Sequence, residues 1–348
     1  MKLEILDLTL NELTDWCLKN GEKPYRAKQI FKWIYQKRVN SFFDMTDISK
    51  SSQQKLDDAF VIHTLQKQLV QTSHDKTQKF LFKTQDGHFL ETVLMFQDYG
   101  LSICVTSQLG CNMGCRFCAS GLLKKKRNLK TSEIVDQILQ VQKENEQRIS
   151  NIVIMGIGEP FDNYENVMDF IVIVNDDFGL GIGARKITIS TCGIVPKIKE
   201  FADQQSQVNL AVSLHAPNDD LRNEIMPINQ AYPIAELMDA LHYYLSKNNR
   251  RLTFEYILLK DINDSKEHAL ELVNLIKGMN AYVNLIPYNP VSEHGYQPSD
   301  LKTSLAFYDT LMKNNIQCTL RKEQGQDIDA ACGQLRAKHE ERTTYENR

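Results

Sequence analysis

Three closely spaced cysteines are the residues in this sequence that most directly suggest chemistry. Cys111, Cys115 and Cys118 lie in the stretch LGCNMGCRFC with the spacing C-x3-C-x2-C. Thiolates bind zinc and iron–sulfur clusters, and most such sites use four protein ligands. A zinc site could take a fourth ligand from elsewhere in the chain, and three core cysteines could lie together by chance. A four-iron cluster held by only three thiolates would keep one iron open for a substrate or cofactor, and this interpretation fits best.

A regular alternation of strands and helices must position this cysteine loop. Helical stretches are expected at 131–145, 163–175, 196–203, 233–246 and 264–277. They alternate with the strand-like runs LSICVTS, NIVIMGI, RKITIST, VNLAVSL, RLTFEYILL and AYVNLIPY. This order predicts βαβ units with a parallel sheet, and the repeats suit a partial or full β/α barrel. The cysteine loop directly follows the first strand, at the edge where such barrels carry their active sites.

A β-hairpin is predicted just before this barrel. The stretch KFLFKTQDGHFLETVLMF has the alternation of two strands, with Asp86 and Gly87 as the turn. In the second strand Glu91 falls on the same face as the apolar side chains of Val93 and Met95. A carboxylate on an apolar face is either an accident of the sheet edge or a group held for acid–base chemistry.

The first part of the chain, residues 10 to 60, is predicted to be helical. The stretch PYRAKQIFKWIYQKR has apolar residues at helical spacing and no acidic residue among its basic ones. These basic residues form either a solvated helix face or a surface that contacts phosphate groups. They are Arg26, Lys28, Lys32, Lys37 and Arg38.

Composition narrows the class of protein further. The chain has 42% hydrophobic and 24% charged residues and a net charge of −3, as in ordinary globular proteins. Eight cysteines in 348 residues are too few for a disulfide scaffold, so their clustering points to metal or redox chemistry. The charged N-terminal stretch is unlike a secretory signal, and no apolar run approaches the ~20 residues of a membrane span. We therefore expect a cytoplasmic protein.

The motifs together resemble a known family. C-x3-C-x2-C is the signature of the radical S-adenosylmethionine enzymes, and further stretches resemble the bacterial RNA adenine-C2 methyltransferases that act on both 23S rRNA and tRNA. The resemblance extends from the early helices to residue 338. The motifs that carry it are RAKQIFKWIYQKR, CNMGCRFCAS, KRNLKTSEIVDQ, MGIGEPFDN, ITISTCG, VSLHAPNDDLRNEIMPIN, LIPYNP and DIDAACGQLR.

The resemblance implies an α/β fold built on the partial (β/α) barrel of the radical S-adenosylmethionine enzymes. Residues 1–75 would form a helical RNA-binding accessory domain, and residues 76–100 a β-hairpin extension. Residues 101–340 would form the barrel, with a reactive cysteine loop near its C-terminal end.

The resemblance also implies two cofactors. Cys111, Cys115 and Cys118 would hold one 4Fe-4S cluster, whose open iron binds S-adenosylmethionine. A glycine in the cofactor site allows close backbone approach, and a carboxylate can accept hydrogen bonds from the cofactor's ammonium group. The residues matching the family's cofactor contacts are Gly158, Glu159, Ser190, Ser213, Leu214, His215 and Asn289.

Three further residues match the family's reactive positions. Cys332 would accept a methyl group from a first S-adenosylmethionine and become S-methylcysteine. A radical made from a second S-adenosylmethionine would activate that methyl group, which would then add to adenine C2. Glu91 would accept the C2 proton, and Cys104 would release the methylated RNA by forming a Cys104–Cys332 disulfide. Without the resemblance, either cysteine would be interpreted as a packed side chain.

Partners follow from the same resemblance. 23S rRNA and tRNA are the expected substrates, a flavodoxin-type protein the expected reductant, and the protein is expected to be a monomer away from membranes. The stretch LLKKKRNLK after the cysteine loop is either a solvated loop or an RNA contact, with Lys124, Lys125, Lys126, Arg127 and Lys130 as its basic residues. Two alternatives remain open: a C8-methylating relative that confers antibiotic resistance, and a non-catalytic RNA-binding protein with zinc or a cluster.

Overall fold

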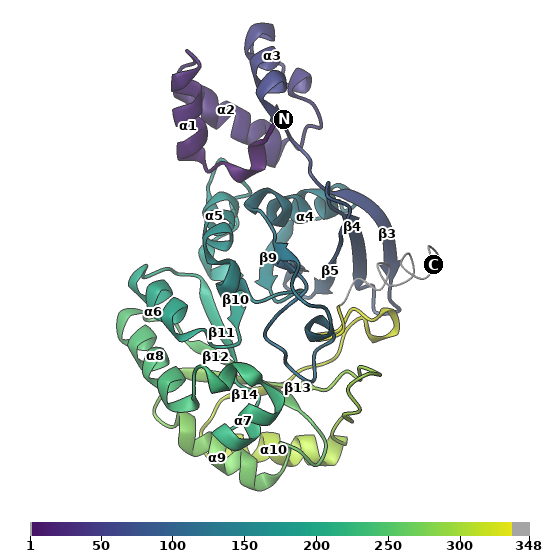
Figure 1. Ribbon diagram of the computed structural model, residues 1–348, viewed down its shortest axis with the longest axis vertical. Coiled ribbons are helices and arrows are strands. Elements are labelled where there is room, and N and C mark those ends of the chain that lie inside the picture. Colours follow the sequence, from purple (N-terminus) through teal and green to yellow (C-terminus); the bar gives the residue numbers. More distant parts are fainter. Residues whose placement is uncertain (1, 336–348) are drawn as a thin grey trace.

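The computed structural model describes residues 2–335 of the chain. Residues 336–340 of the predicted barrel domain lie outside this range. The helices α1, α2 and α3 gather at one end of the molecule, above α4 and α5 (Figure 1). None of the described helices has the length and apolar character needed to cross a membrane.

The helices agree closely with those predicted. All five helices expected between the barrel strands are present, as α4, α5, α6, α8 and α9, whereas α7 and α10 were not predicted. The described α-helices are α1 (Leu10–Lys19), α2 (Tyr25–Phe31), α3 (Lys50–Ala59), α4 (Thr131–Lys143), α5 (Tyr164–Asn175), α6 (Val195–Asp203), α7 (Asp219–Ile225), α8 (Ile234–Lys247), α9 (Lys266–Ile276) and α10 (Leu301–Lys313). A π-helical turn, Lys32–Gln36, directly extends α2.

Within residues 2–335 the main sheet has ten strands, in the order β14-β13-β12-β11-β10-β9-β6-β5-β4-β3. The six predicted barrel strands are present as β6 and β9 to β13, and they pair with one another in parallel. The strands are β3 (Gln66–Thr72), β4 (Gln78–Lys83), β5 (Phe89–Gln97), β6 (Gly100–Cys104), β9 (Ile149–Ile154), β10 (Ile187–Thr191), β11 (Asn209–Ser213), β12 (Leu252–Leu258), β13 (Ala281–Pro287) and β14 (Cys318–Leu320).

The order of the parallel strands explains the barrel. Each new strand is added on the same side of the last, and right-handed crossovers then place every connecting helix on one face of the sheet. The other face curls inward and is left for side chains that can do chemistry. The fold class predicted from the sequence is confirmed.

The predicted hairpin is confirmed as β4 and β5, which pair antiparallel and join the barrel through β6. Gly87 in the turn has φ of +87°, a conformation that glycine adopts readily. A third antiparallel strand, β3, was not predicted, because most of its side chains are exposed and polar. The antiparallel part of the sheet therefore begins at Gln66.

Short strands join the parts of the fold. Within the described residues β1 (Leu3–Glu4) pairs with β2 (Phe60–Val61), which closes the N-terminal helices into one unit. Glu4 accepts a hydrogen bond of 2.8 Å from the Lys130 ammonium, and Asp7 accepts one of 2.7 Å from the Ser132 amide. These contacts fix the N-terminal unit against the start of α4.

Candidate active site

The cysteine loop is closed at its base by two short strands. β7 (Gln108–Leu109) pairs antiparallel with β8 (Arg127–Asn128), so the loop leaves and rejoins the barrel at one point. Gly110 next to this base has φ of +78°, and a Cβ atom there would lie 2.5 Å from the Lys124 carbonyl oxygen. Only glycine fits such a close backbone approach. The loop is therefore held in one shape before any ligand binds.

Cys111, Cys115 and Cys118 all line one cavity of about 160 Å³ inside the end of the barrel. The other walls of this cavity come from the C-terminal ends of the strands, as expected for a β/α barrel. Among the residues predicted to contact the cofactor, those lining the cavity are Gly158, Glu159, Ser190, Ser213 and His215. Leu214 and Asn289 do not line it.

The three loop thiols are electrostatically coupled. Burial raises the pKa of Cys111 to about 12 and raises the pKa of Cys115 well above its usual value, and the other thiols add to both shifts. Burial also raises the pKa of Cys118. Buried thiols of this kind become thiolates when a metal centre supplies positive charge. Three free thiols that line one small cavity have the donor chemistry of a 4Fe-4S cluster held at three irons.

Glu159 is fixed at the edge of this cavity. Its carboxylate accepts a hydrogen bond of 3.0 Å from the Phe161 amide and one of 2.7 Å from the Cys192 amide. Burial raises the pKa of the carboxyl group. Gly158 before it has φ of +109°, and a Cβ atom there would lie 2.6 Å from the Gln108 side chain. The backbone therefore passes close to the cavity, which any side chain at residue 158 would prevent.

The segment Ser213–Leu214–His215 ends β11 at the same cavity. The Leu214 and His215 amides donate to the Glu255 carbonyl at 3.1 and 3.3 Å. His215 Nδ1 accepts from the Ile257 amide at 3.0 Å, and burial lowers the pKa of the ring to about 3, so it is neutral. Ser213 and His215 face the cavity, whereas the Leu214 side chain lies in the hydrophobic core.

Asn289 is buried and contacts the reactive cysteine segment. Its side-chain amide donates to the Cys332 carbonyl at 3.4 Å, and its oxygen accepts from Gln326 at 2.8 Å. The structure therefore places Asn289 beside Cys332 and outside the cavity wall. Any contact with the cofactor would be combined with this support of the Cys332 segment.

Cys332 borders two cavities. Besides the cysteine cavity, it lines an adjoining cavity of about 800 Å³, together with Cys104 and Cys118. Burial raises the pKa of Cys104 to about 12, and the neighbouring Cys332 contributes to that shift. All eight cysteines lie in the described range and are free thiols. The disulfide implied for Cys104 and Cys332 is thus not formed in this structure.

The segment before Cys332 crosses the open side of the barrel and docks on the antiparallel strands. The Gly325 amide donates to the Asp75 carboxylate at 2.9 Å, and the Ser73 hydroxyl bonds to the Asp327 carboxylate. Gln97 and Gln324 are joined by a hydrogen bond of 2.8 Å. We name residues 321–332 the strap, because they join the β14 side of the sheet to the β3–β5 side.

Glu91 is buried on the face of β5 that carries Val93, as predicted. Its carboxylate lies 3.3 Å from the Lys79 ammonium on β4. Lys79 also donates to the Asp329 carbonyl of the strap at 3.3 Å. Glu91 is not among the residues lining either cavity, although Val93 two positions further on lines the larger one.

Two charged residues at the junction of the cavities were missed from the sequence. Glu255 and Arg321 line both cavities, with 3.8 Å between the guanidinium and the carboxylate. Arg321 also lies in the electrostatic field of Cys332 and Cys104. One signal could have identified Glu255, since it is the only charged side chain within the apolar strand LTFEYIL. Arg321 had no comparable signal.

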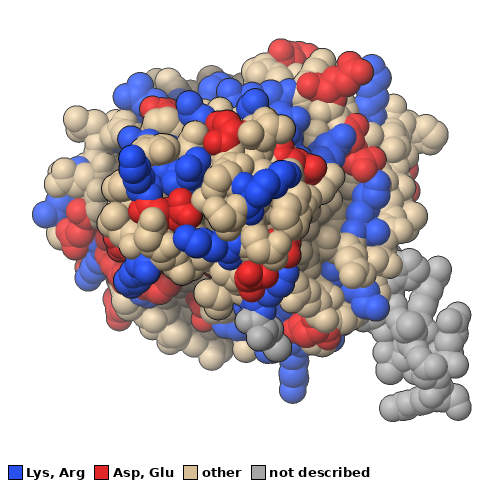
Figure 2. Space-filling view, turned by 90° about the horizontal axis from the view of Figure 1, so that it is seen from above, with Lys and Arg blue, Asp and Glu red and all other residues tan. Residues whose placement is uncertain are grey.

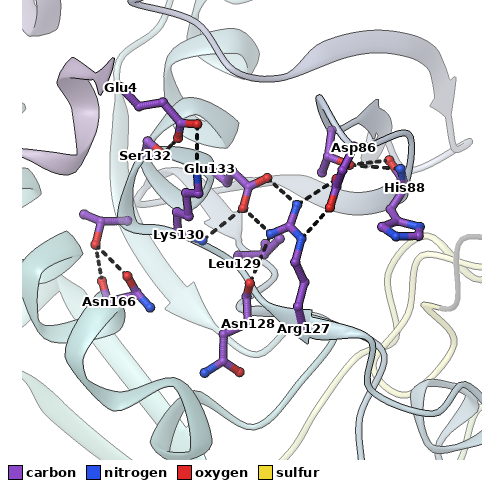
Figure 3. Close-up of polar contacts among 12 residues, drawn as sticks. Glu4, Asp86, His88, Arg127, Asn128, Leu129, Lys130, Ser132, Glu133 and Asn166 are labelled. Carbon is purple, nitrogen blue, oxygen red and sulfur yellow. Dashed lines mark hydrogen bonds and ion pairs between the residues drawn. The ribbon is translucent and has the colours of Figure 1, made fainter. Parts of the chain in front are cut away.

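The basic run after the cysteine loop is largely neutralised within the fold. Arg127 donates to both oxygens of Asp86 and both oxygens of Glu133, at 2.7 to 2.9 Å. Figure 3 shows the guanidinium between these carboxylates, one from the hairpin turn and one from α4. Lys125 pairs with Asp162 at 2.7 Å and Lys130 pairs with Glu4 at 2.8 Å. Three of the five basic residues predicted to contact RNA are therefore engaged in internal ion pairs.

The basic residues of the N-terminal helices have different partners. The ammonium groups of Lys28 and Lys32 lie 5.0 and 5.2 Å from the centre of the Phe178 ring, and that of Lys37 lies 4.3 Å from the Trp33 ring. Such cation–π contacts orient the ammonium groups without neutralising their charge. Figure 2 looks down on this end of the molecule and shows lysine and arginine side chains over much of the face, with acidic ones between them.

Comparisons with known proteins show the family of this chain. The family model described as the ribosomal RNA large subunit methyltransferase N-terminal domain matches residues 3–62, and that of the radical SAM superfamily matches residues 105–273. A probable dual-specificity RNA methyltransferase RlmN of Listeria welshimeri is 55% identical over 355 residues, covering 100% of this chain and 97% of the relative. The chain belongs to the RlmN family. A second RlmN relative, from Oceanobacillus iheyensis, is 56% identical over 345 residues and 97% of each chain.

A solved structure supports the same conclusion about the fold. A radical SAM methyltransferase from Sphaerobacter thermophilus matches with a TM-score of 0.92 at 41% identity, covering 96% of this chain and 99% of that chain. The family and the fold predicted from the motifs are therefore confirmed.

Proposed function

We propose that this protein methylates C2 of an adenine in the peptidyl-transferase centre of 23S rRNA and of an adenine in tRNA anticodon loops. One observation carries the proposal: Cys332 borders both the cavity lined by the three loop cysteines and the cavity lined by Cys104. A methyl group on Cys332 could thus be activated from one side and delivered to RNA on the other. The relatives are named as probable dual-specificity RNA methyltransferases, which supports methylation of RNA.

Each cofactor has residues suited to hold it. Cys111, Cys115 and Cys118 would bind three irons of a 4Fe-4S cluster, with S-adenosylmethionine at the fourth. Glu159 would accept a hydrogen bond from the cofactor's ammonium group, and the backbone at Gly158 would pass close to it. Ser190, Ser213 and His215 complete the cavity around it.

Methyl transfer needs a thiol because adenine C2 lies between two ring nitrogens and is electron-poor. In the first step the Cys332 sulfur attacks the methyl group of one S-adenosylmethionine. A sulfur–carbon bond forms on Cys332, the bond from the sulfonium sulfur to the methyl group breaks, and the thiol proton leaves to solvent. S-methylcysteine and S-adenosylhomocysteine are the products.

A 4Fe-4S cluster held by Cys111, Cys115 and Cys118 would supply one electron for the cleavage of a second S-adenosylmethionine to a 5′-deoxyadenosyl radical, and it would accept one electron back later in the cycle. The methyl group of Cys332 gives a hydrogen atom to this radical. Its methylene carbon then bonds to adenine C2, which leaves RNA covalently attached to Cys332. The target base must leave its stack for this contact, as other enzymes acting on a base require.

Release of the product uses the remaining two residues. Glu91 would take the proton from C2; its carboxylate lies 3.3 Å from the Lys79 ammonium. The Cys104 sulfur attacks the Cys332 sulfur, so that the sulfur–methylene bond breaks and the methylene carbon takes a proton. The resulting Cys104–Cys332 disulfide must be reduced by a cellular dithiol before another cycle.

The cellular setting is part of the same proposal. The protein would work as a monomer in the cytoplasm, where its RNA substrates are made. A flavodoxin-type protein would supply the electron for cofactor cleavage.

The test is nucleoside mass spectrometry of rRNA and tRNA from strains with and without the gene. Loss of 2-methyladenosine in the deletion strain is expected, and the RNA fraction that loses it identifies the substrate. Loss of 8-methyladenosine instead would keep the chemistry but assign it to the C8 carbon. No change in either nucleoside, or one zinc in place of about four iron and four sulfide per purified chain, would overturn the proposal.

A further inference from the structure

The larger cavity runs along the inside of the barrel, away from the cysteine loop. Along β12 it is lined by alternate residues, from Arg251 through Thr253 to Glu255. Four residues of strand span roughly 13 Å. Along β5 and the following turn its lining runs from Val93 to Tyr99, and Cys104 and Cys332 lie at its inner end. The cavity therefore connects the reactive thiols with the opposite end of the barrel.

This opposite end is open to solvent. Tyr99, Arg251 and Asn280 line the cavity and each directly precedes a strand of the barrel. Arg251 and Asn280 are exposed, and Tyr99 is 64% exposed. We name this end the lumen opening. It is formed by the N-terminal ends of the strands, whereas the cysteine loop lies at their C-terminal ends.

Arg250 and Arg251 line the cavity at the lumen opening, and Arg185 lies near them outside the cavity lining. Arg185 stands just before β10, and Arg250 and Arg251 stand just before β12, with β11 between them. Asn209, the first residue of β11, accepts a hydrogen bond from the Arg250 guanidinium and donates one of 2.9 Å to the Arg185 carbonyl. The strand order brings the residues before β10 and β12 close together, and Asn209 links Arg185 to Arg250 through its two hydrogen bonds.

The charges of these arginines are not neutralised within the fold. The guanidinium of Arg185 is hydrogen-bonded to the Gln207 side chain, and that of Arg251 to the Gln317 side chain. All the side-chain acceptors given for the three arginines are neutral amides. No carboxylate in residues 2–335 lies within ion-pair distance of any of them. An opening with exposed guanidinium groups that have no carboxylate within ion-pair distance attracts a polyanion.

The shape of the opening suits a nucleotide. A cavity of about 800 Å³ leads inward to Cys104 and Cys332, and the exposed ring of Tyr99 stands at its rim. Aromatic rings at such positions stack on unpaired bases, and arginines beside them hold the phosphates. A base turned out of an RNA loop can therefore enter the barrel while its backbone stays at the rim.

We infer that RNA enters through the lumen opening, with Arg185, Arg250 and Arg251 holding the phosphates that flank the target adenosine. This inference rests on the proposed function, since it concerns the path of the same substrate to Cys332. It assigns the RNA contact to the N-terminal ends of the strands. The basic run of residues 124–130 then serves mainly to brace the cysteine loop.

The experiment measures RNA binding across a salt series, with labelled tRNA isolated from a strain that lacks the gene. The test variant is Arg185→Gln, Arg250→Gln and Arg251→Gln combined. The control variant replaces three exposed lysines on outer helices, Lys199, Lys266 and Lys302, by glutamine. Both variants lose the same charge, so non-specific electrostatics are matched, and their unfolding temperatures report whether they are folded.

The test variant should lower the slope of log binding constant against log salt by about three, because each phosphate contact contributes about one. The control variant should keep the slope of the unaltered protein. If the combined variant unfolds, Arg251→Gln alone should still lower the slope by about one. The inference is overturned if the test variant keeps the slope of the unaltered protein, or if the control variant lowers the slope as much as the test variant does. It is also overturned if Lys124→Gln, a variant in the basic run after the cysteine loop, lowers the slope and the test variant does not.

Nucleoside analysis of the same tRNA after incubation with the unaltered enzyme distinguishes failure of the lumen-opening inference from failure of the proposed function. Formation of 2-methyladenosine together with an unchanged slope in the test variant would reject the lumen opening and keep the proposed function. Absence of any methylated adenosine with the unaltered enzyme would reject the proposed function itself.

Discussion

The cysteine-loop end of the barrel and the lumen opening are both rich in basic side chains, yet their charges have different partners. Arg127, Lys125 and Lys130 are each paired with carboxylates near the cysteine loop. Arg185 and Arg251 at the lumen opening bind neutral amides. A basic side chain paired with a carboxylate holds two parts of the fold together, whereas a basic side chain without a carboxylate keeps its charge for a bound polyanion.

This difference shows how a basic run should be interpreted. The stretch LLKKKRNLK has more positive charge per residue than any other part of the sequence singled out here, and it adjoins the candidate active site. Two of its neutralising partners are distant in the chain, since Asp86 lies 41 residues before Arg127 and Glu4 lies 126 residues before Lys130, whereas Glu133 lies only 6 residues after Arg127. The charge that RNA would meet is therefore set by the fold and not by the local sequence.

The largest expected effect is a covalent trap. Cys104→Ala should leave RNA attached to Cys332, since no thiol remains to break the sulfur–methylene bond, and the adduct should survive denaturation. In this adduct Arg251 should be shielded from an arginine-specific dicarbonyl reagent, whereas Arg116 beside the cysteine loop should stay reactive. Gel shift and peptide mass spectrometry measure both. Normal turnover without an adduct would remove Cys104 from the mechanism. Shielding of Arg116 alone would place the RNA at the cysteine-loop end and not at the lumen opening.

A large effect on stability is expected at the cysteine-loop end. Arg127→Met should lower the free energy of unfolding by about 2–4 kcal/mol, because Glu133, which is nearly fully buried, would lose its guanidinium partner. Arg251→Met should cost less than about 0.5 kcal/mol, since exposed side chains without buried partners contribute little. Urea denaturation measures both. Arg127→Lys is the matched control, which keeps the charge but loses the paired hydrogen bonds. Equal costs for the two methionine variants would contradict the bracing role.

The same brace predicts a dependence of stability on pH. Hydrogen bonds from Arg127 lower the pKa of Asp86 below its usual range. A carboxyl group with a lowered folded pKa stabilises the fold above its unfolded pKa of about 4, and this stabilisation is lost as the pH falls further. The unfolding free energy of the unaltered protein should therefore exceed that of Asp86→Asn by a constant amount above about pH 5, and by less below about pH 4. A difference independent of pH would exclude this ion pair as its source.

The smallest expected effect concerns Lys125. The pair with Asp162 is partly exposed, so Lys125→Gln should lower the free energy of unfolding by at most about 1 kcal/mol. The salt dependence of tRNA binding should stay unchanged, in contrast to the arginine variant of the lumen opening. Thermal denaturation and the same binding series measure the two quantities. A clear loss of salt dependence would restore the RNA contact predicted from the sequence for this run.

Much of the fold could be predicted from the sequence, because its signals are local. Apolar runs separated by helical stretches predicted β6, β9 to β13 and their parallel pairing, and the Asp86–Gly87 turn predicted the hairpin. The strand β3 was missed because its side chains are mostly polar and exposed, and β14 because it has only three residues. In both cases pairing with a neighbouring strand decides the structure, and pairing is not visible in one sequence.

The candidate site was predicted only in part for the same reason. The spacing of Cys111, Cys115 and Cys118 indicated a metal centre directly, whereas Cys332 was selected through the family resemblance. Glu255 could have been singled out as the only charged residue of an apolar strand, but its meeting with Arg321 could not be predicted, since it depends on strands far apart in the chain. The neutralisation of Arg127 was hidden for the same reason.

The strap also determines when the site can be completed during synthesis. Its contacts join Ser73 to Asp327, 254 residues apart, and Asp75 to Gly325, 250 residues apart. A chain made at roughly 5–20 residues per second builds its N-terminal parts first, and contacts this long in sequence form last. The cysteine loop and the hairpin can thus fold while Cys332 is still unmade. The Cys332 thiol is the last part added to a site that is otherwise already built.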